Sequence, residues 1–240
     1  MIVSIMQPYL LPYIGYFQLI AASDVFVIYD DVQYMKGGWI NRNRVLLNGA
    51  PHWLTMPVAH SPLHTLIRDK DYLRGPAADA KAAGLLHQAY RKAPCFAAGQ
   101  ALAAEIFASP QTNVARFNAH AIGLVCQALG VETKVVWSSD LGRDATLGGQ
   151  DAVLDICRRL GASTYLNAPG GVGLYQGGDF ARAGLQLSFI APRPPAYAQF
   201  GTEHVPNLSI IDALMFCAPD ACAELLRAYD IVIAGQDALA

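Results

Sequence analysis

The hydrophobic positions of the chain form short apolar runs that alternate with helical patterns. Residues 2–6 and 25–29 are apolar and rich in β-branched side chains, which is typical of buried strands. Between them, the apolar residues of 14–21 recur at helical spacing. A strand, a helix and a second strand predict a right-handed crossover connection and a parallel sheet.

The same patterns continue toward the C-terminus. Further strands are predicted at residues 134–137, 164–166 and 185–190. Helices are predicted at residues 151–160 and 180–184, a helix follows residue 209, and a final helix spans residues 218–229. The tail after Val232 is predicted to fray.

Two other segments interrupt this alternation. Asn48-Gly49 is a strong hairpin signal, so residues 44–47 and 52–58 are predicted to pair antiparallel. Residues 76–130 are rich in alanine and show helical spacing throughout. We therefore expect one α/β domain over residues 1–240, with a mainly parallel Rossmann-like sheet, a β-hairpin insertion and a helical block at about 76–130.

The composition narrows the class of protein. Of the 240 residues, 53% are hydrophobic and 15% charged, which excludes general disorder. The net charge is −2, so no general nucleic-acid binding is expected, although a local basic patch is compatible with it. Five scattered cysteines without a Cys-x-x-Cys motif favour reduced thiols in a cytoplasmic protein. Neither membrane insertion nor a cofactor or metal site is evident from the sequence.

Polar and aromatic residues follow the first two predicted strands, at the edge where open α/β sheets place ligands. The first turn is unusually rich in tyrosine, and its substrate-binding candidates are Gln7, Tyr9, Tyr13, Gly15 and Tyr16. The second strand ends in Asp30 and Asp31, the candidate catalytic carboxylates. An Asx-capped turn explains the two aspartates equally well.

Residues 33–44 form the densest basic and amide-rich stretch of the chain. Arginine forks suit phosphate or carboxylate, and glycines let backbone amides approach an anion. The substrate-binding candidates here are Lys36, Trp39, Asn41, Arg42, Asn43 and Arg44. The stretch has no Walker spacing, and an exposed loop leading into the hairpin is the alternative.

Two later segments add further candidates. Asn167, Gly170, Gly171 and Tyr175 belong to a glycine-rich loop that follows a predicted strand, although such loops also make ordinary turns. Asn207, Ser209 and Asp212 lie at the start of a predicted helix, where they either cap it or face a ligand. All seven are predicted to bind substrate.

Four blocks resemble the WbqC-like family: IMQPYLLPYIGYFQLI, VIYDDVQYMKGGWINRNRVL, TYLNAPGGVGLYQ and VPNLSIIDALMF. Members of this family accompany genes for bacterial surface polysaccharides such as O-antigen. The resemblance implies a function in making or modifying an activated, amino-bearing sugar, and transfer of an aminoacyl group such as glycyl is the suggested reaction. The chain departs from the family at Gly37-Gly38, where relatives often carry Arg-Gly, and so lacks one phosphate contact.

A second, weaker resemblance concerns the first turn. Tyr13-Ile14-Gly15-Tyr16 follows a strand, and is similar to the His-x-Gly-His signature of nucleotidyl transferases and class I aminoacyl-tRNA synthetases. Tyrosine is a poor general acid near pH 7, so this resemblance bears mainly on the fold.

Three functions fit these observations. The first is a transferase acting on a nucleotide-linked amino sugar, in which Lys36, Arg42 and Arg44 hold the diphosphate and an acyl or aminoacyl donor is attacked directly. The sequence contains no Cys–His or Ser–His–Asp constellation at recognisable spacing, so covalent catalysis is disfavoured. The alternatives are an ATP-dependent adenylating or nucleotidyl-transfer enzyme and a non-catalytic protein that binds a sugar nucleotide.

Overall fold

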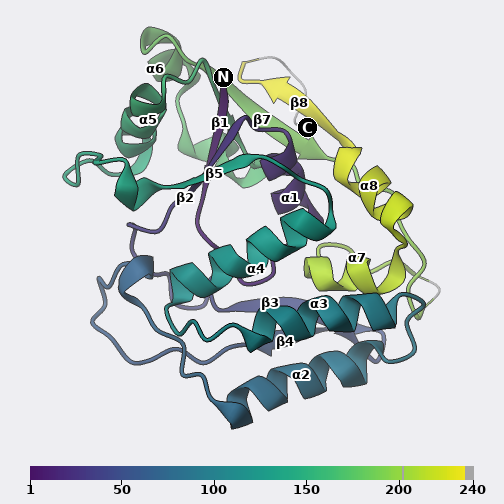
Figure 1. The fold of residues 1–240 in the computed structure, drawn as a ribbon. Helices are drawn as coiled ribbons and strands as arrows, with labels where there is room; N and C mark the ends of the chain where they lie inside the picture. The colour runs from purple at the N-terminus through teal and green to yellow at the C-terminus, as the bar shows by residue number, and fades with distance from the viewer. Residues whose placement is uncertain (202, 236–240) are drawn as a thin grey trace.

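A computed structural model describes residues 1–201 and 203–235, and its centre is a six-stranded sheet (Figure 1). The strands are β1 (Ile2–Met6), β2 (Val25–Ile28), β5 (Lys134–Trp137), β6 (Thr164–Asn167), β7 (Gln186–Pro192) and β8 (Tyr229–Ile233). Their order is β5-β2-β1-β6-β7-β8, and all neighbours except β7 and β8 run parallel. The predicted mainly parallel, Rossmann-like sheet is confirmed.

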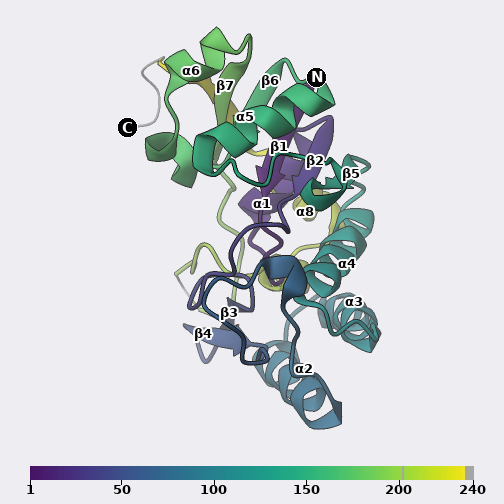
Figure 2. The ribbon, with the colours of Figure 1, turned by 90° about the vertical axis from the view of Figure 1, so that its left-hand side faces the viewer.

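Helices cover both faces of this sheet, because successive strand residues point to opposite sides. Val3 and Ile5 of β1 pack in the layer formed by α5 (Gly149–Leu160) and α6 (Gly177–Arg182). The opposite face packs against α1 (Ile14–Ala21) and α8 (Pro219–Arg227). The two views in Figures 1 and 2 show α5 and α6 on one side of the strands and α8 on the other.

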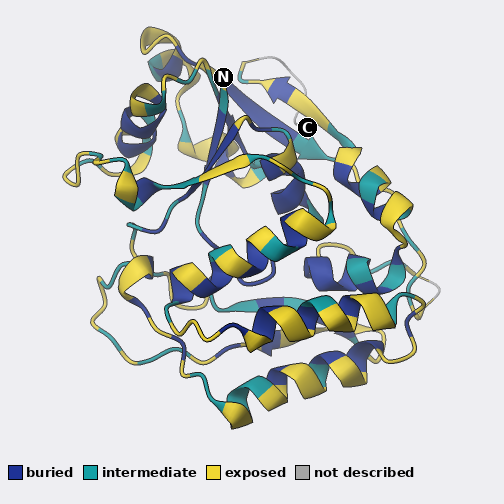
Figure 3. Cartoon of the chain, viewed as in Figure 1, coloured by how far each residue is buried: buried dark blue, intermediate teal, exposed yellow. Residues whose placement is uncertain are grey.

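A second block lies beyond the carboxyl ends of the strands. It contains the hairpin β3 (Arg42–Leu47) and β4 (Ala50–Thr55), and the helices α2 (Pro76–Tyr90), α3 (Phe96–Ala108), α4 (Val114–Ala128) and α7 (Ile210–Phe216). Three short 3-10 turns are η1 (Ile67–Asp69), η2 (Ser138–Asp140) and η3 (Pro169–Leu174). Figure 3 shows the exposed residues along the outward faces of α2, α3 and α4. The predicted hairpin and helical block are both present.

The hairpin register differs from the one expected. Asn48 and Gly49 both have positive φ (52° and 78°), the backbone of a two-residue hairpin turn. The turn pairs Leu47 with Ala50 and, further along, Arg44 with Trp53. The second strand therefore spans residues 50–55, whereas the sequence predicted 52–58.

The sequence did not predict β8. Residues 218–229 were expected to form one helix with a frayed tail, but α8 ends at Arg227 and Tyr229–Ile233 pairs antiparallel with β7. β8 is an edge strand with mainly exposed side chains, but Ile231-Val232-Ile233 is a β-branched run that favours a strand, so a local signal was present. Residues 236–240 lie outside the described residues.

The strand order reverses between β1 and β6, the switch point of a doubly wound sheet. Because β1 and β6 are parallel neighbours, the turn after β1 and the loop after β6 both begin at the carboxyl edge there. Figure 1 shows β1 running from the N-terminus toward the hairpin block. The fold thus brings the tyrosine-rich turn and the glycine-rich loop to the edge where such sheets bind ligands. None of the described helices is long and apolar enough to cross a membrane.

Candidate functional site

The turn after β1 is held in place by two distant segments. Leu11 has φ +43°, a left-handed conformation that costs a non-glycine residue about 1–2 kcal/mol. Its carbonyl accepts hydrogen bonds from Asn43 Nδ2 and Ser209 Oγ, both at 2.8 Å. The next residue, Pro12, accepts from the backbone N–H of Ile210 at 2.9 Å. Three segments predicted as site walls therefore meet at one strained turn.

The three tyrosines of this turn differ in how far they are buried. Tyr16 is buried and donates its hydroxyl to the Gln7 carbonyl at 2.9 Å, so it is part of the core. Tyr9 and Tyr13 are half-buried, and Gly15 allows the Tyr13 ring to lie where a Cβ would come within 2.4 Å of it. Burial raises the pKa of all three tyrosines, so their hydroxyls stay protonated near neutral pH. Tyr9 and Tyr13 can contact a ligand, but none of the three tyrosines can serve as a base near neutral pH.

Two arginines and two tryptophans stack on the outer face of the hairpin; we call Trp39, Arg42, Arg44 and Trp53 the Arg–Trp stack. The Trp39 and Trp53 rings lie 5.4 Å apart, with 39% and 41% of each residue exposed. The Arg42 guanidinium lies 4.2 Å from the centre of the Trp53 ring, and that of Arg44 lies 5.5 Å from the Trp39 ring. The face combines aromatic surface with positive charge.

The charge of the Arg–Trp stack is not neutralised within the described part of the chain. Neither Arg42 nor Arg44 forms an ion pair there, although Arg143 and five other arginines do. Arg42 donates to the carbonyls of Gly37 and Gly38, and Arg44 donates to the Asn207 carbonyl at 3.3 Å. These bonds fix the guanidinium groups without cancelling their charge, as an anion site requires.

The other candidates of this stretch have different surroundings. Asn43 is buried, and its side chain donates to the Leu11 carbonyl in the turn after β1. Asn41 accepts from Tyr34 Oη and donates to the Met56 carbonyl, both at 2.8 Å, which joins the loop to the hairpin. Lys36 is exposed on the loop that Arg42 holds, close in sequence to the Arg–Trp stack.

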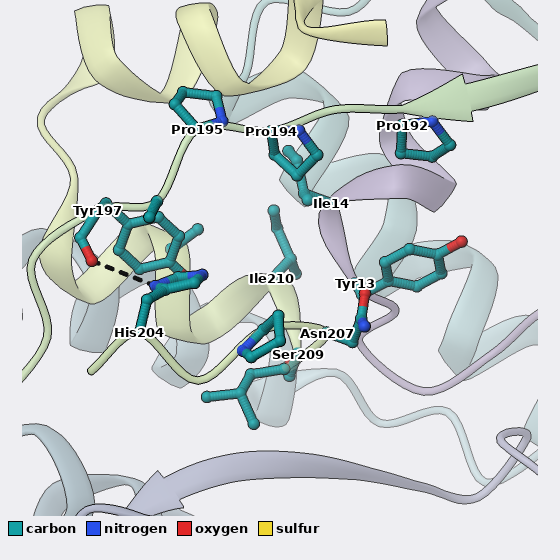
Figure 4. Close-up of a pocket in the computed structure, with 14 residues that line it drawn as sticks. Tyr13, Ile14, Pro192, Pro194, Pro195, Tyr197, His204, Asn207, Ser209 and Ile210 are labelled. Atoms are coloured by element: carbon teal, nitrogen blue, oxygen red, sulfur yellow. Dashed lines mark hydrogen bonds between the residues drawn. The ribbon is translucent and has the colours of Figure 1, made fainter.

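A cavity of about 170 Å³ opens beside the Arg–Trp stack (Figure 4). Its wall includes Tyr13, Tyr197, His204, Asn207 and Ser209, together with Ile14, Pro192, Pro194, Pro195, Ala196, Pro206, Leu208, Ile210 and Ala213. Figure 4 shows His204 and Tyr13 at opposite ends of it, with the Tyr13 hydroxyl directed away from His204. Asn207 lines the cavity and accepts from Arg44, so the cavity and the Arg–Trp stack adjoin at this residue.

Asp212 lies beneath the cavity and is fully buried in the first turn of α7. Its carboxylate accepts from Tyr90 Oη at 2.9 Å, Tyr197 Oη at 2.7 Å and Gln199 Nε2 at 2.6 Å. Burial raises the pKa of this carboxyl, against the three donors, which lower it. Asp212 thus fixes Tyr197, which lines the cavity, and Ser209 caps the helix through the Ile211 N–H.

Asp30 and Asp31 lie together at the end of β2, where they are bonded to residues more than 100 positions away. Asp30 is buried and accepts from Ser138 Oγ, from the Ser139 N–H and from Ser139 Oγ at 2.8–3.2 Å. Asp31 accepts from Arg143 Nε at 2.5 Å, and it lies 2.5 Å from Ser138 Oγ, whose single hydrogen the two carboxylates share. These hydrogen bonds assign both carboxylates a structural function but leave acceptor sites free, so their catalytic assignment stays a prediction.

Replacing Asp30 by asparagine distinguishes the two interpretations. Because Asp30 holds the Ser138–Ser139 turn, we expect the variant to lose roughly 1–3 kcal/mol of stability. Thermal unfolding should show a decrease of about 2–4 °C for each kcal/mol. Asp140→Asn, at an exposed carboxylate next to the same turn, is the control and should unfold like the wild type. An unchanged melting temperature would refute the structural assignment and leave the catalytic one.

The substrate-binding candidates of the glycine-rich loop lie in different surroundings. Asn167 ends β6 with its side chain accepting from the Ala168 N–H at 2.8 Å, and Gly171 lies against it, where a Cβ would come 2.0 Å from Asn167 Nδ2. Gly170 has open space around it. Tyr175 packs edge-on against Tyr165, on the α5–α6 side of the sheet, whereas the cavity residues pack on the opposite side.

Several residues of the site were not predicted. Trp53 could have been found, because a two-residue turn at Asn48-Gly49 pairs it with Arg44. Tyr90 and Gln199 bind Asp212, and Tyr197 and His204 line the cavity. No local pattern marks these four, because Tyr90 is the last residue of a helix and the other three lie in one irregular segment between β7 and α7.

Comparisons with known proteins agree with the resemblance noted above. Residues 7–224 match the model of the WbqC-like protein family. The chain is 30% identical over 227 residues to a protein of Mycobacterium tuberculosis named "Uncharacterized protein Rv1507c", covering 91% of this chain and 95% of that protein. No solved structure gives a significant match.

Proposed function

Because the chain belongs to the WbqC-like protein family, we propose that it is a transferase that modifies the amino group of a nucleotide-linked sugar. The proposed reaction is transfer of an aminoacyl group, such as glycyl, to the sugar amine. The setting that the family resemblance implies is the biosynthesis of bacterial surface polysaccharide such as O-antigen, which would take place in the cytoplasm.

The observation that carries this proposal is the Arg–Trp stack beside the cavity. A sugar nucleotide has an aromatic base, a diphosphate and a sugar ring, and these three parts need different surroundings. Exposed indole rings suit the base, and unpaired arginines suit the diphosphate. The cavity, at about 170 Å³, is smaller than the roughly 300–1,000 Å³ of sites that hold a whole ligand, and so suits the sugar end alone.

The alternatives have less support. In the Tyr-x-Gly-Tyr turn, Tyr16 is buried and bonded to the Gln7 carbonyl, so its hydroxyl does not present itself to a phosphate as the second histidine of His-x-Gly-His enzymes does. This weakens the case for adenylation. A non-catalytic sugar-nucleotide protein would need the same binding residues, so only a search for product separates it from the transferase.

Thermal shift with a panel of UDP-, GDP- and dTDP-linked amino sugars tests the proposal. A ligand at a hundred times its dissociation constant stabilises the folded state by about 2.7 kcal/mol, which raises the melting temperature by roughly 5–10 °C for a chain of this size. We expect such a rise with at least one sugar nucleotide and none with ATP and magnesium. A magnesium-dependent rise with ATP alone would instead support adenylation. Binding without product, with any aminoacyl donor, would leave the non-catalytic alternative.

A further inference from the structure

His204 belongs to the cavity wall, and its ring is held on one side only. Nδ1 lies 3.2 Å from the Tyr197 carbonyl oxygen, and the ring meets the Tyr197 ring edge-on with 4.7 Å between centroids (Figure 4). Tyr197 is in turn fixed by its bond to buried Asp212. Tyr197 therefore fixes the position of the imidazole, and the opposite edge of the ring borders the cavity.

The hydrogen bond to Tyr197 selects the tautomer of His204. A carbonyl oxygen can only accept, so Nδ1 must carry the proton that it donates. In the neutral ring, Nε2 then has a free lone pair, and it has no hydrogen-bond partner in the described part of the chain. Figure 4 shows this edge of the ring directed toward the middle of the cavity.

Two other polar groups of the cavity wall are hydrogen-bonded within the protein, and a third remains protonated. Ser209 Oγ donates to the Leu11 carbonyl, and the Asn207 carbonyl accepts from Arg44. Tyr13 keeps its proton near neutral pH because burial raises its pKa. The Asn207 side-chain oxygen is also without a hydrogen-bond partner in the described part of the chain, but an amide oxygen is not a base. His204 Nε2 is thus the group of the wall that can both accept a hydrogen bond and take up a proton.

We propose, building on the transferase function above, that the cavity receives the amino group of the sugar and that His204 Nε2 accepts its proton during transfer. The amine nitrogen attacks the carbonyl carbon of an activated aminoacyl ester, forming the C–N bond and moving the π electrons to the carbonyl oxygen. His204 takes the N–H proton. When the carbonyl re-forms, the ester C–O bond breaks and the imidazolium returns the proton to the leaving alcohol, which yields an amide and an alcohol.

His204→Gln tests the catalytic part of this proposal. Glutamine keeps the size and a polar end but cannot carry the proton, so we expect transfer to fall by about 10²–10⁴-fold. The affinity for UDP-glucosamine should stay within about threefold, because the Arg–Trp stack is untouched. The residual rate should lose the decline toward acid that a histidine base gives the wild type. His64→Gln, at an exposed loop histidine, is the matched control and should transfer normally.

Nitrogen-15 NMR of the histidine rings tests the cavity part without any transfer assay. We expect His204 to show the Nδ1–H tautomer, and its Nε2 resonance to shift on addition of UDP-glucosamine or concentrated glucosamine, but not of UDP. An Nε2–H tautomer, or no response to either amine, would overturn the inference.

A response of Nε2 without transfer under any aminoacyl donor would support the amine site and count against the transferase. Transfer with normal kinetics in His204→Gln would instead uphold the transferase and remove His204 from the reaction.

Discussion

Replacing Asp212 by alanine should lower the free energy of unfolding by about 3 kcal/mol or more. The change removes the acceptor of three buried or half-buried donors, and each donor left unpaired costs on the order of 1 kcal/mol or more. For a chain of this size we expect a decrease of roughly 6–12 °C in the melting temperature, measured by calorimetry. Asp212→Asn keeps one acceptor oxygen, so its loss should be less than half as large. An alanine variant as stable as the wild type would refute the structural importance of this network.

The same residue makes stability depend on pH. Because burial raises the Asp212 pKa above its ordinary 3.8, the folded state binds the proton more tightly than the unfolded state does. The resulting stabilisation is complete below pH 3.8 and is lost as the pH rises through the raised pKa. The stability of the wild type relative to Asp212→Asn should therefore decline with rising pH above 3.8. A difference that increases over this range would contradict the assigned direction.

Replacing both Arg42 and Arg44 by alanine should weaken the binding of a sugar nucleotide by about a hundredfold or more. Each charge-assisted hydrogen bond to a diphosphate contributes about 1.5–3 kcal/mol, and 1.4 kcal/mol corresponds to a tenfold change in affinity. The affinity can be measured by isothermal calorimetry with UDP-glucosamine. Wild-type affinity in the double variant would remove the arginines from the site.

Two controls separate the loss of ligand contacts from structural damage. Arg116 also stacks on a tryptophan, at 4.2 Å from the Trp137 ring, but lies on α4, outside the proposed site. Arg116→Ala should therefore bind as the wild type does. Exchanging Arg42 and Arg44 for lysine keeps the charge but loses the planar fork, so we expect intermediate affinity.

Much of the fold could be predicted because its signals are local. The buried strands β1, β2, β6 and β7 are apolar runs, and the hairpin turn follows from one dipeptide, Asn48-Gly49. β8 could also have been predicted, because Ile231-Val232-Ile233 is a β-branched run. Its antiparallel pairing with β7 could not, since a single sequence does not display which strands pair.

Of the candidate site, the sequence indicates only the sheet edge at which its segments meet. The rule that ligands bind at the carboxyl ends of strands singled out the tyrosine turn, and in the structure Asn43 and Ser209 are hydrogen-bonded to that turn. It could not show that Asp30 and Asp31 are bonded to Ser138, Ser139 and Arg143, since these residues follow a different strand. No sequence pattern indicated His204, because the orientation of its ring depends on a hydrogen bond to the backbone carbonyl of Tyr197.

The central claim, that the Arg–Trp stack binds the nucleotide, is tested most directly by tryptophan fluorescence. Two of the three tryptophans, Trp39 and Trp53, belong to the stack, and Trp137 lies elsewhere. We predict that UDP-glucosamine changes the emission of the wild type but not that of Trp39→Phe/Trp53→Phe, in which only Trp137 emits. Unchanged wild-type emission at saturating ligand, or an equal change in the double variant, would contradict the account.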